Sequence, residues 1–269
     1  MTRARPVGVF DSGVGGLTVL RALRRRLPAE ETLYLGDTAR LPYGPKSADT
    51  VRRYALEAGE FLVSRRVKLL VVACNTASSR ARGFLSGRLD VPVVGVVEPG
   101  AREAATRSRR GVIGVIGTRG TIESRSYEEA IRAVRPEAIV HSRACPLFVA
   151  LAEEGWTEGE VARLTADRYL APLLDKEIDT LVLGCTHYPL LKDLFRGVVG
   201  PEVELVDSAE ATAAAVEERL REDGLLAPGE NGGEGYYVTD DAERFRLLAD
   251  RIMGGPIPHL ERVDLDPTA

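Results

Sequence analysis

Short apolar runs alternate along this chain with longer amphipathic segments, and this alternation restricts the fold more than any other feature. In the first third of the chain the runs fall at 7–10, 32–37, 68–74 and 91–97, with helical patterns between them. Apolar runs of this length between helical segments are typical of parallel strands in βαβ units. The sequence therefore predicts an α/β fold built on a parallel sheet.

The same pattern begins again about 110 residues later along the chain, an offset that suits a small domain and is too long for a solenoid repeat. Strand-like runs are predicted here at 110–118, 138–145, 180–185 and 202–208. We therefore expect two similar flavodoxin-like α/β domains with parallel sheets, related by pseudo-symmetry.

The end of the chain has no counterpart at the start of the second repeat. It carries a strand pattern at 236–240 between two helical patterns, and we expect it to pack on the first domain. The predicted domains are 1–97 together with 208–269, and 98–207. No linker rich in Pro, Gly or Ser separates them, so we expect closely apposed domains with the active site in the cleft between them.

Composition argues against several classes of function. The net formal charge is −4 over 269 residues, which favours no nucleic-acid partner. No apolar run reaches the length of a membrane span, and the N-terminal segment lacks the apolar core of a signal peptide, so we expect a cytoplasmic protein without membrane contact. The three cysteines and three histidines show no C-x-x-C pair or ligand spacing, so no disulfide framework or metal site is predicted.

Two of the three cysteines end matching apolar runs of the two repeats. Cys74 begins the stretch CNT and Cys185 begins the stretch CTH. Ligands of open parallel sheets bind outside the carboxyl ends of the strands, so these two cysteines should meet across one pocket if the domains face each other. Cys145 lacks the polar residues that follow the other two, and we expect it to be structural.

Two thiols on opposite faces of a small molecule suit a two-base proton transfer. One thiolate removes a hydrogen from a carbon atom and the other thiol delivers one from the far side, which inverts the stereocentre. A helix N-terminus behind each cysteine would favour the thiolate. A redox disulfide between Cys74 and Cys185 is an alternative, which a substrate bound between them would prevent.

Polar residues at the other predicted strand ends would complete such a site, because their hydroxyl, amide and backbone groups can bind a carboxylate and an ammonium and stabilise a carbanion. Asp11 could hold the ammonium or act as a base near Cys74. His187 could tune the Cys185 thiol or donate to a carboxylate. The other expected substrate contacts are Ser12, Tyr43, Gly44, Asn75, Thr76 and Thr186.

No cofactor is predicted from the residues. The stretch FDSGVGGLTV follows a strand but lacks the complete glycine pattern of a dinucleotide site and its acidic residue downstream. We interpret it as a tight turn into a helix. No lysine stands in an obvious Schiff-base setting, so pyridoxal phosphate is not indicated either.

Five motifs, taken together and in this order, resemble those of the glutamate racemases, a cofactor-independent family. They extend from residue 7 to about residue 208 and read GVFDSGVGGLTV, GDTARLPYGPKS, VVACNTAS, CPLFVALAEEG and LVLGCTHYPLL. The resemblance implies interconversion of L-glutamate and D-glutamate, which supplies D-glutamate for peptidoglycan synthesis. Glutamate as the substrate comes from this resemblance, whereas the residues alone indicate only a two-thiol proton transfer.

The resemblance also implies roles for individual residues. Cys74 and Cys185 would be the catalytic acid/base pair, each serving one enantiomer, with Asp11 and His187 assisting them. Glu153 would act near the second cysteine, and the substrate contacts of the family fall on the polar residues named above, with Asp11 and His187 among them. Members of this family are often dimers, so a homodimer is possible.

Three alternatives stay open on the sequence. The first is a related racemase that acts on aspartate or a hydantoin. The second is a two-domain binding protein that closes on an amino acid without chemistry. The third is a thiol redox protein that forms an internal disulfide between Cys74 and Cys185.

Overall fold

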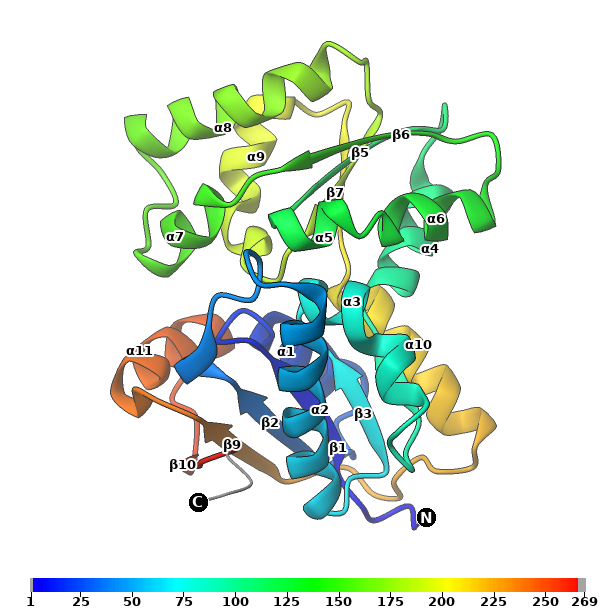
Figure 1. Ribbon diagram of the computed structural model, residues 1–269, viewed down its shortest axis with the longest axis vertical. Helices are drawn as coiled ribbons and strands as arrows, with labels where there is room; N and C mark the ends of the chain where they lie inside the picture. Colours follow the sequence, from blue (N-terminus) through cyan, green and yellow to red (C-terminus); the bar gives the residue numbers. More distant parts are fainter. Residues whose placement is uncertain (1, 266–269) are drawn as a thin grey trace.

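The computed structural model describes residues 2–265, which form two lobes stacked along the long axis of the molecule (Figure 1). The first lobe holds a six-stranded sheet in the order β10-β9-β2-β1-β3-β4, and the second lobe holds a four-stranded sheet in the order β6-β5-β7-β8. Every strand pairing in both sheets is parallel. The prediction of an α/β fold with two parallel sheets is confirmed.

The first lobe is built around three central strands whose residues are all buried, as strands covered by helices on both faces must be. Its strands are β1 (Val7–Asp11), β2 (Thr32–Gly36), β3 (Leu69–Val72), β4 (Val93–Gly95), β9 (Glu234–Val238) and β10 (Leu260–Arg262). Its helices are α1 (Leu17–Arg26), η1 (Thr38–Arg40), α2 (Ala48–Ser64), α3 (Asn75–Ser86), α10 (Ala209–Glu222) and α11 (Ala242–Met253).

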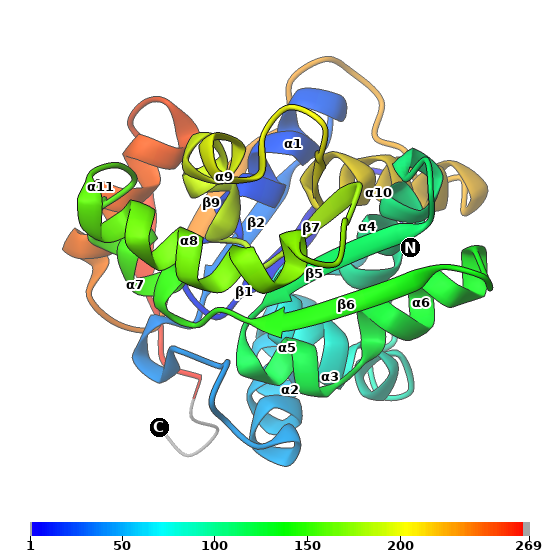
Figure 2. The same cartoon turned by 90° about the horizontal axis from the view of Figure 1, so that it is seen from above.

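The second lobe has two hydrophobic cores, one on each face of its sheet. Helices α8 and α9 cover one face, and α4 and α6 cover the other (Figure 2). The strands are β5 (Val112–Gly117), β6 (Ile139–Ala144), β7 (Thr180–Gly184) and β8 (Glu204–Asp207). The helices are α4 (Val97–Arg107), α5 (Arg119–Glu123), α6 (Ser126–Val134), α7 (Leu147–Glu153), α8 (Glu160–Leu174), η2 (Tyr188–Leu191) and α9 (Lys192–Val199).

The end of the described chain returns to the first lobe. Strand β9 pairs with β2, and α10 packs against α1. These contacts support the division into 1–97 with 208–269 and 98–207, which we keep as our proposal. Among residues 2–265, no helix is both long enough and apolar enough to cross a membrane.

The strand predicted at 91–97 ends earlier in the structure than its apolar residues suggested. Strand β4 stops at Gly95, and Val97 begins helix α4. Glu98 lies in the first turn of that helix, where a negative charge is favourable, and Pro99 is tolerated there because the first turn needs no N–H donor. Residues that suit the first turn of a helix thus override the apolar pattern at this point.

Candidate active site

A small cavity lies between the two lobes at the carboxyl ends of their strands. Residues that follow β1 and β3 line it from the first lobe, and residues that follow β5 and β7 line it from the second. This is the position at which open parallel sheets bind ligands. Ten of the residues singled out in the sequence line the cavity: Ser12, Tyr43, Gly44, Cys74, Asn75, Thr76, Glu153, Cys185, Thr186 and His187.

The lobes are closed around this cavity, whose volume is only about 30 Å³. A single water molecule needs on the order of 10–15 Å³ on this measure, so the cavity holds about two waters and no amino acid. Hydrogen bonds between the lobes keep it closed: Gly120 donates its N–H to the Gly44 carbonyl at 2.9 Å, and the Thr76 and Thr118 hydroxyls are 2.9 Å apart. The expected cleft is therefore present in a closed arrangement that is too small for an amino acid.

Cys74 lies directly before helix α3, and its side chain is 5% exposed. Burial is the main cause that raises the pKa of its thiol, and the Asp11 carboxylate adds to it, while hydrogen bonds with Ser12 and the Ala77 N–H lower it. The result is a pKa of about 12. The helix N-terminus thus lowers the pKa of Cys74 through the Ala77 N–H, but burial outweighs this effect.

Cys185 has a different environment, in which an imidazole lies beside the sulfur atom. The Cys185 Sγ is 3.8 Å from Nδ1 of His187, and Nε2 of His187 is 3.1 Å from a carboxylate oxygen of Glu153. Burial lowers the pKa of His187, but its interactions with Cys185 and Glu153 outweigh burial and raise the pKa from 6.5 to about 10. The imidazole is therefore protonated at neutral pH, and it lies as a cation beside the Cys185 sulfur.

The two cysteines thus differ in their surroundings. The thiol of Cys74 keeps its proton at neutral pH, whereas Cys185 lies beside a cation. All three cysteines of the chain are free, and Cys145 is buried in the core of the second lobe rather than at the cavity. One thiol and one thiolate are the two states that a proton transfer between opposite faces of a substrate requires.

Asp11 ends strand β1 and lies behind the cavity, fully buried. Its carboxylate accepts hydrogen bonds from the Gly13 N–H at 2.9 Å and the Thr186 hydroxyl at 3.4 Å. Burial raises the pKa of this carboxyl group, and the nearby charge of His187 partly offsets that effect. In the closed structure Asp11 acts on Cys74 through its charge and is not part of the cavity surface.

Tyr43 lines the cavity, but its hydroxyl group points elsewhere. It donates to the Asp37 carboxylate, which also accepts from Arg40 Nε at 2.7 Å. The hydroxyl is therefore occupied, and Tyr43 can contact a substrate only through its ring or its backbone.

Several residues line the cavity that are not among the expected substrate contacts. Gly13 and Thr118 follow predicted strands, so the strand-end rule could have identified them. Leu41 and Pro42 lie on the loop between β2 and α2, and Val149 lies on α7. No local pattern marks these three as cavity residues, because the closing of the two lobes brings them there.

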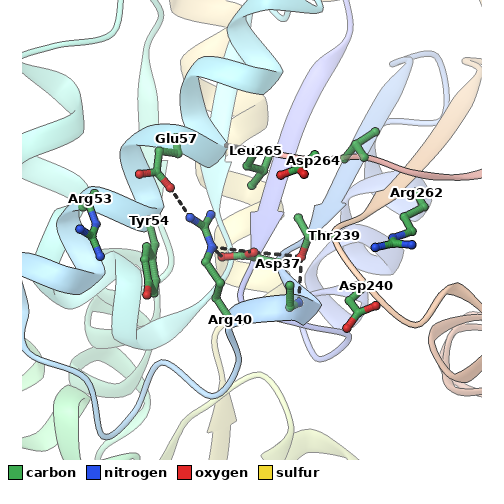
Figure 3. Close-up of a pocket in the computed structure, with 12 residues that line it drawn as sticks. Asp37, Arg40, Arg53, Tyr54, Glu57, Thr239, Asp240, Arg262, Asp264 and Leu265 are labelled. Atoms are coloured by element: carbon green, nitrogen blue, oxygen red, sulfur yellow. Dashed lines mark hydrogen bonds and ion pairs between the residues drawn. The ribbon is translucent and has the colours of Figure 1, made fainter. Parts of the chain in front are cut away.

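A larger cavity, of about 880 Å³, lies on the first lobe beside α2 and the end of the described chain (Figure 3). Arg40 reaches between Asp37 and Glu57 there and forms ion pairs with both. None of the predicted site residues lines this cavity. We therefore place the chemistry in the smaller cavity. Within residues 2–265, no group of three or more potential ligand side chains could hold a metal ion.

Comparison with known proteins gives consistent relatives. The family model described as Asp/Glu/Hydantoin racemase matches residues 8–216. A curated glutamate racemase from Geobacter metallireducens is 56% identical over 263 residues, which cover 97% of each chain. A glutamate racemase structure from Bacillus anthracis has a TM-score of 0.95 at 41% identity and 98% coverage of both chains. A structure from Francisella tularensis, described as glutamate racemase in complex with D-glutamate, has a TM-score of 0.92 at 37% identity, covering 98% of this chain and 99% of that one.

Proposed function

The chain belongs to the aspartate/glutamate/hydantoin racemase family, and we propose that it interconverts L-glutamate and D-glutamate by moving the α-proton between Cys74 and Cys185. The observation that carries this proposal is that both cysteines line one cavity, each at a strand end of a different lobe. The D-glutamate it makes supplies peptidoglycan synthesis.

For one enantiomer, we propose that the reaction starts with a thiolate at Cys185 and a thiol at Cys74. The Cys185 thiolate removes the α-proton from the face it contacts, and the electron pair stays on the substrate as a carbanion. The Cys74 thiol then gives its proton to the opposite face of the same carbon. The turnover leaves a thiol at Cys185 and a thiolate at Cys74, which is the starting state for the other enantiomer.

The polar residues around the cavity would stabilise the carbanion and hold the substrate. The Nδ2 atom of Asn75 is a buried donor without a partner in the described protein, and the hydroxyl groups of Ser12, Thr76 and Thr186 lie around the same cavity. Donors placed before the reaction stabilise charge that develops on a carboxylate at little reorganisation cost. We infer that these groups bind glutamate, together with Tyr43, Gly44, Asp11 and His187.

We extend the proposal to the location and the oligomeric state of the protein. We infer a cytoplasmic location, where thiols stay reduced and catalytic cysteines persist. A homodimer stays a prediction that rests on the family resemblance alone.

The substrate is tested by circular dichroism of L-glutamate, L-aspartate and hydantoins with the purified protein. We expect the optical signal of L-glutamate to decay to zero, because the two enantiomers have equal free energy, and the other signals to stay constant. Faster decay of aspartate or a hydantoin, or a constant glutamate signal, would contradict the proposed function.

Glu153 offers a test of how the charge on His187 is maintained. The hydrogen bond with His187 is the main cause that holds the pKa of Glu153 below its usual range, so it is a carboxylate at neutral pH. Glu153→Gln removes this charge, and the pKa of His187 should fall below its present value of about 10. We expect the alkaline limb of the pH profile of kcat to move to lower pH by about one unit, while kcat near pH 7 stays almost unchanged because most of the imidazole remains protonated there.

Glu154→Gln is the matched control for this variant. Glu154 is the next residue along the chain and forms an exposed ion pair with Arg244 at 3.1 Å. Exposed ion pairs contribute little, so we expect an almost unchanged pH profile of kcat. Equal profiles for the two variants would show that Glu153 does not act through His187.

A further inference from the structure

Tyr127 lies outside the cavity, yet its hydroxyl group holds a residue that lines it. Tyr127 is on α6 of the second lobe and is 2% exposed. Its hydroxyl donates to Oδ1 of Asn75 at 2.7 Å. Asn75 is the first residue of α3 in the first lobe, directly after Cys74. This buried hydrogen bond therefore crosses from one lobe to the other.

The ring of Tyr127 also packs against the strand end that carries the second cysteine. A Cβ atom added to Gly184, the residue before Cys185, would lie 3.2 Å from the ring. Burial is the main cause that raises the pKa of the Tyr127 hydroxyl above its usual value of 10, so the group keeps its hydrogen and can donate it. Tyr127 thus contacts both cysteine-bearing segments from behind the cavity.

The NH₂ group of the Asn75 side chain has no hydrogen-bond partner within the described protein. The Nδ2 atom is buried and unpaired, although Asn75 lines the cavity. Buried donors without partners are rare in folded proteins, and one beside a cavity points to an acceptor on a ligand. Because Tyr127 donates to Oδ1, the NH₂ group must face away from Tyr127. An amino acid substrate offers a carboxylate as the matching acceptor.

We propose that Tyr127 is a positioning residue that orients the Asn75 amide so that its NH₂ group binds a carboxylate of the substrate. Because the bond joins the two lobes, this orientation is fixed only when the lobes are closed. Tyr127 thereby links closure to substrate binding without touching the substrate itself. The inference rests on the proposed function, since glutamate supplies the carboxylate.

The first test is Tyr127→Phe, which removes the hydroxyl and keeps the ring. We expect KM to rise about tenfold for both enantiomers, the order of magnitude of one charge-assisted hydrogen bond, with little change in kcat. Tyr236→Phe is the matched control: Tyr236 is buried in the first sheet, and its hydroxyl donates to Glu234 at 2.6 Å. That variant loses the same atom far from the cavity, and its KM should not change.

The second test is a double-mutant cycle with Asn75→Ala. If Tyr127 acts through Asn75, then Tyr127→Phe should not raise KM further once the Asn75 amide is gone. Additive effects on KM would overturn the proposal, because they would mean that Tyr127 acts independently of Asn75. An unchanged KM for Tyr127→Phe in the otherwise native protein would overturn it as well.

A third measurement uses the native protein and does not depend on the folding of a variant. The chain has no glutamine and only two asparagines, Asn75 and Asn231, so an ¹⁵N spectrum of side-chain NH₂ groups contains two signal pairs. Asn231 lies in an exposed loop, and Asn231→Asp assigns its pair. Added glutamate should shift the Asn75 pair and leave the Asn231 pair in place. Racemisation without a shift of the Asn75 pair would overturn this inference alone, whereas absence of racemisation would overturn the proposed function.

Discussion

Cys74→Ala and Cys185→Ala should each lower the racemisation of both glutamate enantiomers by about 10³-fold or more, within the range attributed to general acid–base groups. Each turnover needs one thiol group on each face of the α-carbon, so neither cysteine can replace the other. Serine should not rescue either position, because a hydroxyl is a far weaker acid than a thiol. Initial rates measured by circular dichroism from each enantiomer test this prediction.

Cys145→Ala is the matched control for the two cysteine variants. Cys145 is fully buried in the core of the second lobe, and its sulfur lies 3.6 Å from the Arg143 carbonyl. We expect the racemisation rate of Cys145→Ala to stay close to that of the native protein, although the variant loses some stability. Near-native turnover by Cys74→Ala or Cys185→Ala would refute the assignment of the two bases.

His187→Asn should lower kcat about 10²-fold at neutral pH, the lower end of the general acid–base range. Asparagine keeps a neutral donor near the position of Nδ1 but cannot carry the positive charge that His187 places beside the Cys185 sulfur. Because the equilibrium constant of racemisation is one, kcat/KM must fall equally for both enantiomers, and any difference between them appears only in kcat and KM separately. Rates that match the native enzyme would show that the imidazolium is not needed.

The same variant should change how stability depends on pH. The pKa of His187 is raised from 6.5 to about 10 in the folded protein, so the folded state holds a proton that the unfolded state releases. The stability from this group is complete below pH 6.5 and is lost as pH rises through about 10. Between pH 6 and 9, Tm of the native protein should fall, and that of His187→Asn should fall less. Equal slopes of Tm against pH would contradict the raised pKa.

The fold and the positions of the two cysteines could be predicted from the sequence because they depend on local patterns. Buried parallel strands have continuous apolar runs, as in β3 and β7, and the residue after each run lies at the ligand-binding edge. The strand-end rule was therefore enough to bring Cys74 and Cys185 to one cavity. The same rule identified the other strand-end residues that line this cavity.

The properties that depend on packing between the lobes could not be predicted in this way. The neutral thiol of Cys74 results from burial and from the charge of Asp11, a residue of another strand that no pattern around Cys74 indicates. Glu153 ends helix α7, where only the family resemblance marked it. Tyr127 lies on α6, more than 50 residues from the asparagine it orients. None of these partners is close in sequence to the residue on which it acts.

The most direct test of the account is the incorporation of deuterium at the α-carbon when each enantiomer reacts in D₂O. Thiols exchange their hydrogen with solvent, so the thiol that delivers a proton to the product should deliver deuterium. In the early reaction we expect deuterium at the α-carbon of the product and protium at the α-carbon of the remaining substrate, starting from either enantiomer. Product that retains the protium of its substrate would mean that a single base serves both faces, and it would contradict the two-cysteine mechanism.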